Sequence, residues 1–269
     1  MPLTGKALRL ARLSRGGDGR YLFIPLDHSV ADGPIVPAAG FAGLVADIVE
    51  GGADAVVVHK GRARMIPPTL LTRTGLVVHL SASTNHAPDV DAKVLVGDVE
   101  ECVRLGADAV SVHVNIGSDT EADQLSDLGT VAAACERWGM PLVAMIYPRG
   151  PRVDNPFRPE LIANVVAIAA DLGVDIVKTV LAAPPERMAE VVDSSPLPII
   201  VAGGGGGSDE SLTAFAVSAM ANGCAGLAVG RRVFTSSSPK QAVQKLAAIV
   251  HGHGLADQPE PHPELAGAL

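Results

Sequence analysis

The sequence predicts a single-domain α/β protein folded as a closed (β/α)8 TIM barrel, and three observations favour that fold. One phrase, in which glycine and a small apolar residue precede a β-branched run, recurs at 51–58, 105–112, 172–179 and, more weakly, 222–229. Apolar runs and amphipathic stretches alternate along the chain, as they do where helices cover a parallel sheet. The length of 269 residues suits one barrel, because α/β barrels of about 200–250 residues are routinely single domains.

Each copy of the phrase contains the parts of a helix-to-strand connection. The glycine ends a helix in the left-handed conformation, and the apolar run that follows suits a strand covered on both faces. Together with the other apolar runs, these copies give eight predicted strands: 21–26, 54–59, 76–81, 108–114, 141–147, 175–180, 198–202 and 225–230. The predicted helices are 38–50, 98–105, 121–138, 157–172, 184–193 and 209–222. The connection 60–75, rich in Arg, Pro and Thr, is the exception, with no predicted helix.

An open, doubly wound sheet with a nucleotide site is the rival fold. That fold would place a Gly-x-Gly-x-x-Gly phosphate loop after the first strand, and no such motif follows residues 21–26. The glycine run 203–207 does not fit the spacing either, because Ser208 stands where the third glycine would be. Eight strand–helix repeats therefore favour the closed barrel.

The two ends of the chain differ from the repeating part. Near the N-terminus, basic residues recur every three positions: Lys6, Arg9, Arg12 and Arg15. Leucines interleave with them and no apolar signal core or cleavage site follows, so we expect an N-terminal helix with a basic face rather than a targeting segment. Prolines after Gly252 predict a flexible C-terminal tail over 253–269, which leaves 1–252 as the barrel domain.

Composition argues against several functional classes. A formal net charge of −8 argues against a nucleic-acid partner. The most apolar stretch, 161–181, is interrupted by charged residues and predicts no membrane span. The three cysteines form no C-x-x-C pair, so we expect a reducing, cytoplasmic location without disulfides. The histidines show no tight metal-ligand spacing, and we predict neither a metal nor a cofactor.

Polar residues stand where the predicted strands end. In such barrels the active site lies at the carboxyl ends of the strands. The residues found there are Asp27-His28, His59-Lys60, Ser81-Ala82-Ser83, His113 to Asn115, Tyr147 to Arg149, Lys178-Thr179, the glycines from 203, and Gly230-Arg231. The sequence therefore predicts a polar site at one mouth of the barrel.

The glycine run and the end of the eighth strand together predict a phosphate site. Glycine lets backbone N–H groups approach a ligand closely, and the N–H groups of a helix N-terminus bind anions. Loops after strands seven and eight form the recurrent phosphate site of this architecture, and a guanidinium suits phosphate. The residues predicted to bind phosphate are Gly203, Gly204, Gly205, Gly206, Gly230 and Arg231. The alternative is a flexible glycine loop beside solvated arginines.

Lys178 lies within an apolar strand of a chain that has only six lysines. Burial disfavours the charged form of an amine, and a free lysine amine can form a Schiff base with a carbonyl substrate. The alternative is a strand-end lysine whose stem packs while its head reaches solvent. The polar mouth and the predicted phosphate site favour the nucleophile.

Further candidates surround this lysine. Asp27 can set the protonation of the amine or pass a proton to a substrate hydroxyl, although an aspartate that caps a turn fits the sequence equally well. Tyr147 can exchange a proton or only form a hydrogen bond, and Arg149 adds positive charge near the mouth. His28, next to Asp27, is a predicted substrate contact. Lys60 is the competing amine; it lies one step beyond its strand and ranks second, as an electrostatic helper.

Taken together, these motifs carry a family likeness. They are Pro-Leu-Asp27-His28-Ser-Val-Ala-Asp-Gly-Pro, His59-Lys60-Gly61, Tyr147-Pro-Arg-Gly, Asp175-Ile-Val-Lys178-Thr, Val201-Ala-Gly-Gly and Val229-Gly-Arg231. In this order and spacing, over residues 7–252, they resemble the class I aldolases of the DhnA/DeoC-like group. The chain looks most similar to the 2-amino-3,7-dideoxy-D-threo-hept-6-ulosonate synthase branch. That branch includes enzymes that join L-aspartate 4-semialdehyde to dihydroxyacetone phosphate on the way to 3-amino-4-hydroxybenzoate.

The resemblance implies roles for matching residues. Lys178 would form the Schiff base, Asp27 and Tyr147 would transfer protons, and the glycine loop with Gly230 and Arg231 would hold the substrate phosphate. It also implies a phosphorylated ketone and an aldehyde as substrates, no cofactor, and a homo-oligomer such as a decamer.

Departures from the family pattern leave the aldehyde acceptor open. Ser29 and Ala31-Asp32 stand where glycine and serines are common, and the 203–207 loop is pure glycine. Three alternatives stay open beside the synthase: a fructose-bisphosphate aldolase with the same lysine, a phosphosugar isomerase or epimerase without a covalent step, and a non-catalytic binder of phosphate ligands.

Overall fold

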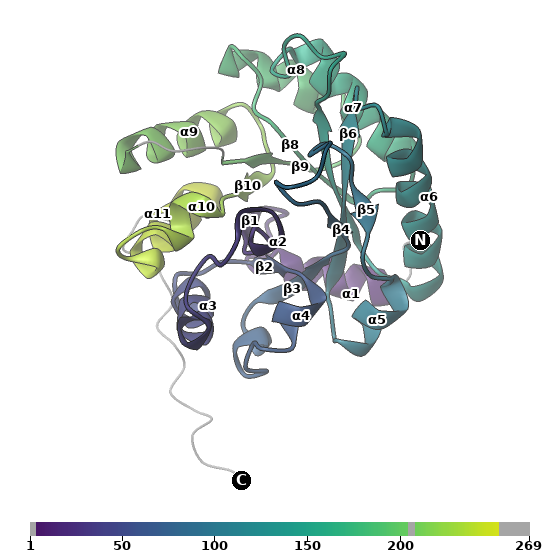
Figure 1. The fold of residues 1–269 in the computed structure, drawn as a ribbon. Helices are drawn as coiled ribbons and strands as arrows, with labels where there is room; N and C mark the ends of the chain where they lie inside the picture. The colour runs from purple at the N-terminus through teal and green to yellow at the C-terminus, as the bar shows by residue number, and fades with distance from the viewer. Residues whose placement is uncertain (1–3, 204–207, 253–269) are drawn as a thin grey trace, which may run out of the picture.

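Eight parallel strands close into a barrel in the order β1-β10-β9-β8-β7-β6-β3-β2 (Figure 1). The structure, a computed structural model, describes residues 4–203 and 208–252. Its barrel strands are β1 (Tyr21–Pro25), β2 (Ala55–Val58), β3 (Gly75–His79), β6 (Ala109–Ile116), β7 (Leu142–Pro148), β8 (Ile176–Thr179), β9 (Ile199–Ala202) and β10 (Gly226–Ala228). Each predicted strand overlaps one of these, and the predicted (β/α)8 barrel is confirmed.

Helices surround the barrel (Figure 1). They are α1 (Thr4–Leu13), α2 (Ser29–Asp32), α3 (Phe41–Glu50), α4 (Lys60–Ala63), α5 (Val99–Arg104), α6 (Glu121–Trp138), α7 (Pro159–Asp171), α8 (Met188–Asp193), α9 (Asp209–Ala221), α10 (Arg231–Phe234) and α11 (Pro239–His251), with 3-10 turns η1 (Ala38–Gly40), η2 (Leu70–Thr72) and η3 (Pro185–Arg187). All six predicted helices and the N-terminal helix are present. In the described part of the chain, no helix combines the length and apolarity needed to cross a membrane.

The sequence prediction lacked helix α11, the β4–β5 pair and the short helices α2, α4 and α10; α4 lies in the connection 60–75, where the sequence predicts no helix. Helix α11 packs against α3 and α9 on the outside of the barrel. A short antiparallel pair, β4 (Ser81–Ala82) and β5 (Val94–Leu95), lies beside β6. The prediction of a flexible tail over 253–269 falls outside the described residues.

Side chains of the barrel strands alternate between two apolar cores. Outward-facing residues such as Val177 pack with the surrounding helices. Inward-facing residues such as Met145 and Ile176 form a smaller cluster inside the barrel, together with Leu13 of α1. Successive strand residues point to opposite faces of a sheet. Lys178 therefore faces the barrel interior, two positions after Ile176.

The aspartate of the recurring phrase links neighbouring strands at the N-terminal end of the barrel. Each of three aspartates accepts the backbone N–H of a leucine on the adjacent strand: Asp54 from Leu22 at 2.7 Å, Asp108 from Leu76 at 2.9 Å and Asp175 from Leu142 at 2.8 Å. Because an unpaired buried carboxylate is costly, these bonds explain why the phrase keeps an acid before each of three apolar strands.

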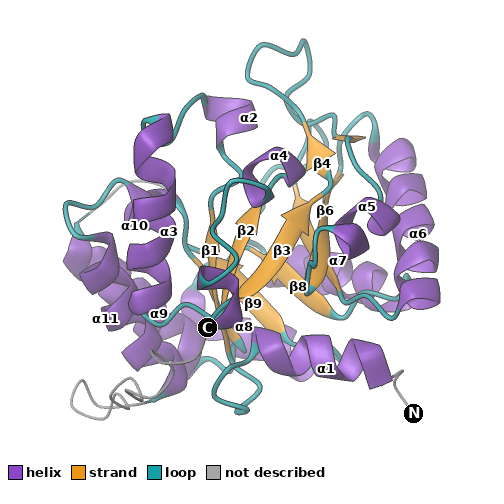
Figure 2. Ribbon diagram, turned by 90° about the horizontal axis from the view of Figure 1, so that it is seen from below, coloured by secondary structure: helices purple, strands orange, loops and turns teal. Residues whose placement is uncertain are grey.

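The basic face of α1 and the residue Arg15 that follows the helix bind the same three aspartates. Arg12 Nε lies 2.7 Å from Asp108 Oδ1, and Lys6 Nζ lies 3.1 Å from Asp175 Oδ1. The Arg15 backbone N–H donates to Asp54 Oδ1 at 3.0 Å. The predicted basic helix thus closes the bottom of the barrel, at the end opposite α2 and α4 (Figure 2).

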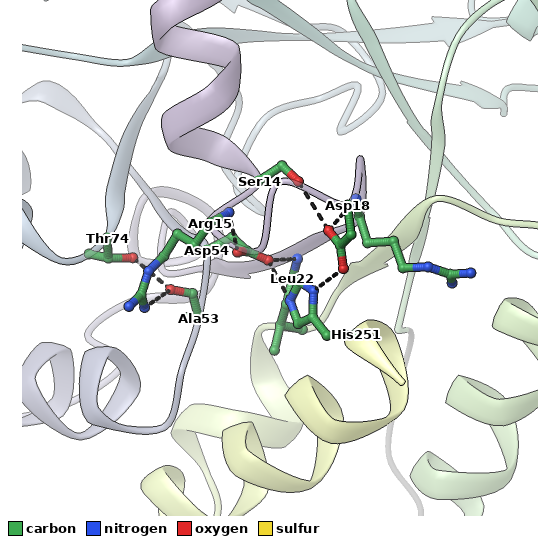
Figure 3. Close-up of polar contacts among 9 residues, drawn as sticks. Ser14, Arg15, Asp18, Leu22, Ala53, Asp54, Thr74 and His251 are labelled. Atoms are coloured by element: carbon green, nitrogen blue, oxygen red, sulfur yellow. Dashed lines mark hydrogen bonds and ion pairs between the residues drawn. The ribbon is translucent and has the colours of Figure 1, made fainter. Parts of the chain in front are cut away.

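His251, the last residue of α11, joins the network around Asp54 (Figure 3). Its Nε2 lies 3.1 Å from Asp54 Oδ2, and its Nδ1 lies 2.8 Å from Asp18 Oδ2. The hydrogen bond to Asp54, against the effect of burial and with help from Asp18, raises the pKa of His251 to about 9. The imidazolium therefore fixes the end of α11 to the bottom of the barrel.

This network predicts a pH-dependent contribution to stability. A raised folded-state pKa means that the contribution is complete below the ordinary value of 6.5 and is lost as the pH rises through about 9. Allowing for solvent screening, we expect His251→Gln to lower the free energy of unfolding by about 1–2 kcal/mol near pH 6, and by much less near pH 10. Urea unfolding of both proteins measures this difference, and an equal loss at the two pH values would contradict a charged imidazole.

Candidate functional site

The carboxyl ends of the strands surround a cavity of about 740 Å³, a size typical of small-molecule sites. Eight of the predicted site residues line it: Asp27, His28, Tyr147, Arg149, Lys178, Gly203, Gly230 and Arg231. Gly204, Gly205 and Gly206 lie outside the described residues. The fold thus gathers residues from five strands or strand ends at a single mouth, as the barrel prediction required.

Lys178 presents its amine to the cavity from β8. The residue is 9% exposed and is in register with Met145 of β7 and Ile200 of β9. Its Nζ contacts the Met145 sulfur at 3.7 Å, and no carboxylate among the described residues lies within ion-pair distance. A thioether is only a weak acceptor, so this contact leaves the amine accessible to a carbonyl carbon.

Asp27 follows β1 and has histidines on two sides. Its Oδ1 lies 3.4 Å from His28 Nδ1, and its Oδ2 lies 4.0 Å from His79 Nε2. Burial alone would raise the pKa of this carboxyl, but His79, Lys178 and His28 together hold the pKa below its usual value. Asp27 is therefore ionised at neutral pH and begins any reaction as a proton acceptor.

His79 and His59 form a second layer beside Asp27. The His79 ring is buried, its Nδ1 lies 2.9 Å from the Ser111 hydroxyl, and burial lowers its pKa to about 4. His59 Nδ1 donates to the His79 carbonyl oxygen at 3.0 Å. Both rings line the cavity, and burial lowers the pKa of His59 as well, so neutral imidazoles are favoured on this side of the carboxylate.

His28 occupies a tight space beside the end of β10. Its ring meets Phe234 edge-on, with centroids 5.2 Å apart, and burial lowers the pKa of the imidazole. A Cβ atom at Gly230 would lie 2.6 Å from His28 Cε1 and 2.6 Å from the Pro25 carbonyl oxygen. Glycine at position 230 is therefore what allows His28 to pack against the backbone here.

The two arginines after Gly230 have different surroundings. Arg232 donates to the Ser208 carbonyl oxygen and, at 2.8 Å, to the Ser211 hydroxyl, so it holds the first turn of α9. Arg231 is exposed and lines the cavity, and it has no ion-pair partner in the described residues. Both arginines line the cavity, and Arg231 is the one whose guanidinium has no protein partner within the described residues, so it is the better candidate to bind a phosphate.

Tyr147 lies near the end of β7, in register with Asn115 of β6. It is buried, and its ring centroid lies 5.1 Å from that of His113. The His113 ring is held in turn by a hydrogen bond of 2.9 Å between its Nε2 and Asn115 Oδ1. The Arg149 guanidinium lies 5.1 Å above the Tyr147 ring, a cation–π contact. Arg149 thus stays at the rim of the cavity beside the phenol.

Lys60 lies apart from these residues. It begins α4, its ammonium is 2.9 Å from Glu101 Oε2, and it is not part of the cavity lining. The prediction that Lys60 assists substrate binding came from its position after a strand. Because the chain turns into α4 at this residue, the side chain reaches α5 instead, and we leave Lys60 out of the proposed site.

A buried amine, a carboxylate and a phenol lie around one cavity of a (β/α)8 barrel, an arrangement that suits an enzyme acting on a carbonyl substrate. The chain matches the DeoC/LacD family aldolases over residues 21–236 and belongs to that family. It is a class I aldolase, which works through a lysine Schiff base. The predicted family is confirmed.

Relatives with curated names include two synthases. The 2-amino-4,5-dihydroxy-6-oxo-7-(phosphonooxy)heptanoate synthase of Streptomyces griseus is 48% identical over 250 residues, covering 93% of this chain and 91% of the relative. The 2-amino-3,7-dideoxy-D-threo-hept-6-ulosonate synthase of Halobacterium salinarum is 39% identical over 265 residues, covering 98% of this chain and 97% of the relative.

Among solved structures, an archaeal fructose 1,6-bisphosphate aldolase superposes with a TM-score of 0.83 and 26% identity, covering 92% of this chain and 99% of that one. A second archaeal structure, with its catalytic lysine covalently bound to the carbinolamine intermediate of the substrate, gives a TM-score of 0.83 and 25% identity, covering 92% of this chain and 100% of the other. Both are similar to this chain over nearly its whole described length.

The packing at Gly230 gives a direct test of whether phosphate binds beside Gly230 and Arg231, at the end of β10. Gly230→Ala places a methyl group against a backbone carbonyl, which cannot move as a flexible side chain can, so we expect weaker binding of inorganic phosphate and a loss of about 1–3 kcal/mol in stability. Gly43→Ala is the matched control, because nothing lies within 4 Å of a Cβ at this position in α3. Calorimetric titration with phosphate and thermal unfolding measure both effects. Unchanged phosphate affinity in Gly230→Ala would show that phosphate binds elsewhere.

Proposed function

We propose that this enzyme joins dihydroxyacetone phosphate to L-aspartate 4-semialdehyde through a Schiff base on Lys178. One observation carries the proposal: the buried amine of Lys178 opens on the same cavity as Asp27, Tyr147 and the phosphate-suited end at Gly230 and Arg231. A nucleophile, two proton carriers and an anion site are the parts that an aldol addition to a phosphorylated ketone requires.

The product named for the Streptomyces griseus relative supports this pair of substrates. That compound has a ketone at C6 and a hydroxyl at C4, the pattern of an aldol product. Breaking the bond between C4 and C5 gives a four-carbon amino acid aldehyde, aspartate 4-semialdehyde, and a three-carbon ketone phosphate, dihydroxyacetone phosphate. The compound named for the Halobacterium salinarum relative also has an amino group at C2 of its acid end. This second compound likewise supports aspartate 4-semialdehyde as the acceptor.

The residues account for the chemical steps in order. The phosphate binds near Gly203, Gly230 and Arg231, and the amine of Lys178 adds to the ketone carbon. Loss of water leaves an iminium ion, which withdraws electrons and makes the neighbouring carbon acidic. The resulting enamine attacks the aldehyde carbon, and hydrolysis of the new iminium releases the product and restores the amine.

Asp27 and Tyr147 move the proton between these steps. Since Asp27 begins ionised, it must receive a proton before it can give one. The proton removed from the donor carbon passes through Tyr147 to Asp27 and is delivered to the alkoxide that forms on the aldehyde. One proton is removed and one is delivered, so the site returns to its starting charge.

Trapping with borohydride tests the covalent step. We expect dihydroxyacetone phosphate and borohydride to leave a reduced adduct on the peptide that contains Lys178, and Lys178→Ala to abolish both adduct and turnover. Lys240→Ala is the control, because that ammonium pairs with Glu50 at 2.9 Å on the outside of the barrel. Mass spectrometry of the digested protein locates the adduct. Turnover of a phosphosugar without any adduct would instead support an isomerase.

Substitution of the proton carriers tests their roles separately. We expect Asp27→Asn and Tyr147→Phe each to lower kcat by about 10²–10⁴-fold, the range for a positioned acid–base group. The adduct with dihydroxyacetone phosphate should still form in both variants, since the amine remains. Steady-state kinetics with aspartate 4-semialdehyde and the trapping assay give the two readouts. Cleavage of fructose 1,6-bisphosphate as the dominant activity of the wild-type enzyme would reject the proposed acceptor.

A further inference from the structure

The segment that includes β4 and β5 carries polar residues to one side of the cavity. Ser83, Val90, Asp91 and Lys93 all lie on this segment and line the cavity. The pair β4–β5 lies next to β6 (Figure 1). In barrel order, β7 and β6 lie on one side of β8, while β9 and β10 lie on the other. The segment therefore faces Lys178 from the side opposite the phosphate end.

Several hydrogen bonds hold this segment in place. The Asp91 carbonyl oxygen accepts from Asn115 Nδ2 at 2.8 Å and from Gln124 Nε2 at 2.9 Å, and both donors are buried. Earlier in the segment, Asn85 Nδ2 donates to Asp32 Oδ1 of α2 at 2.9 Å. Because the segment is hydrogen-bonded to β6, α6 and α2, these contacts position Asp91 and Lys93 at the cavity.

Lys93 has one hydrogen-bond donor left for a ligand. Its ammonium donates to the Val90 carbonyl oxygen at 2.7 Å and to the Ser83 hydroxyl. An ammonium has three donors, and the third has no partner among residues 4–203 and 208–252. Burial and the charge of Arg149 lower the pKa of Lys93, so a bound anion would relieve repulsion between two neighbouring cations.

Arg149 and Asp91 complete a group of mixed charge. Arg149 lines the cavity and, within the described chain, has no carboxylate at ion-pair distance; its guanidinium stacks on Tyr147. Asp91 also lines the cavity and, among the described residues, its side chain accepts no hydrogen bond. Two cations with free donors next to an unpaired carboxylate match a ligand group that has both signs of charge.

We propose that Lys93 and Arg149 bind the α-carboxylate of the acceptor aldehyde, and that Asp91 binds its α-ammonium group. This inference rests on the proposed function, since it assigns the acceptor end of the same site. The segment from β4 to β5 then selects a zwitterionic amino acid aldehyde over an uncharged aldehyde or an aldehyde phosphate. The donor phosphate binds on the other side of Lys178, so the two charged ends of the product lie at opposite ends of the cavity.

A series of acceptors tests the assignment. Succinic semialdehyde has the carboxylate of aspartate 4-semialdehyde without the amine, butanal has neither group, and glyceraldehyde 3-phosphate has a phosphate instead. Each is assayed with dihydroxyacetone phosphate, and kcat/KM is compared between the wild-type enzyme and the variants Lys93→Met, Arg149→Met and Asp91→Asn. Lys240→Met on α11 is the matched control for loss of a lysine charge.

We expect the variants to separate the two charged groups. Lys93→Met and Arg149→Met should each lower kcat/KM for aspartate 4-semialdehyde and succinic semialdehyde by about tenfold or more, the usual effect of a charge-assisted hydrogen bond. Lys93→Met should leave butanal unchanged. Arg149→Met also removes the cation over the Tyr147 ring, so it should lower kcat/KM with every acceptor but by a larger factor for the two carboxylate acceptors. Asp91→Asn should lower kcat/KM for aspartate 4-semialdehyde alone. Lys240→Met should match the wild type with every acceptor.

Distinct outcomes would overturn the inference or the proposed function. An equal loss with all acceptors, butanal included, would show that Lys93 only supports the segment, and a loss confined to glyceraldehyde 3-phosphate would show a phosphate site. Either result overturns the inference while the trapped adduct on Lys178 remains. Absence of that adduct in the wild-type enzyme would instead reject the proposed function itself.

Discussion

The closed parallel barrel is the constraint on which the site depends. Because all eight strands run the same way, their carboxyl ends meet at a single mouth. Because successive residues of a strand alternate between faces, the position of Ile176 in the interior core brings Lys178 inside as well. A shift of one residue in the register of β8 would turn the amine outward among the helices, and no substitution at the mouth could replace it.

Stability and chemistry are separated along the barrel axis. At the N-terminal end, the repeated aspartates are fully engaged by backbone N–H groups, by the basic face of α1 and by His251. At the carboxyl end, Lys178, Arg149 and Arg231 line a cavity with no ion-pair partner among the described residues. The charges that hold the fold together are thus paired within the chain, whereas the Arg149 and Arg231 guanidinium groups at the cavity have no carboxylate at ion-pair distance among the described residues. This contrast supports our proposal that the cavity binds a phosphorylated ketone and a charged aldehyde.

Much of the fold and part of the site could be predicted from the sequence, for physical reasons. A buried strand between two helices leaves a strong apolar signal, and each of the eight barrel strands was located by it. Helix α11 also leaves a signal in the sequence, because Val243, Leu246 and Val250 stand at helical spacing after Ser238-Pro239. Lys93 gives no such signal in the sequence. A lysine in a polar connection resembles any solvated lysine, and only the folded chain shows that it lines the cavity. Lys60 shows the converse: its place after a strand suggested the mouth, but the turn into α4 directs it to Glu101.

The central claim is that the amine of Lys178 bonds to the ketone carbon of a phosphorylated donor within this cavity. A crystal structure of the enzyme soaked with dihydroxyacetone phosphate tests it most directly. The account predicts continuous electron density between Lys178 Nζ and the ketone carbon, with the phosphate beside Gly230 and Arg231. An intact ketone lying free of the amine, or a phosphate bound away from β9 and β10, would contradict it.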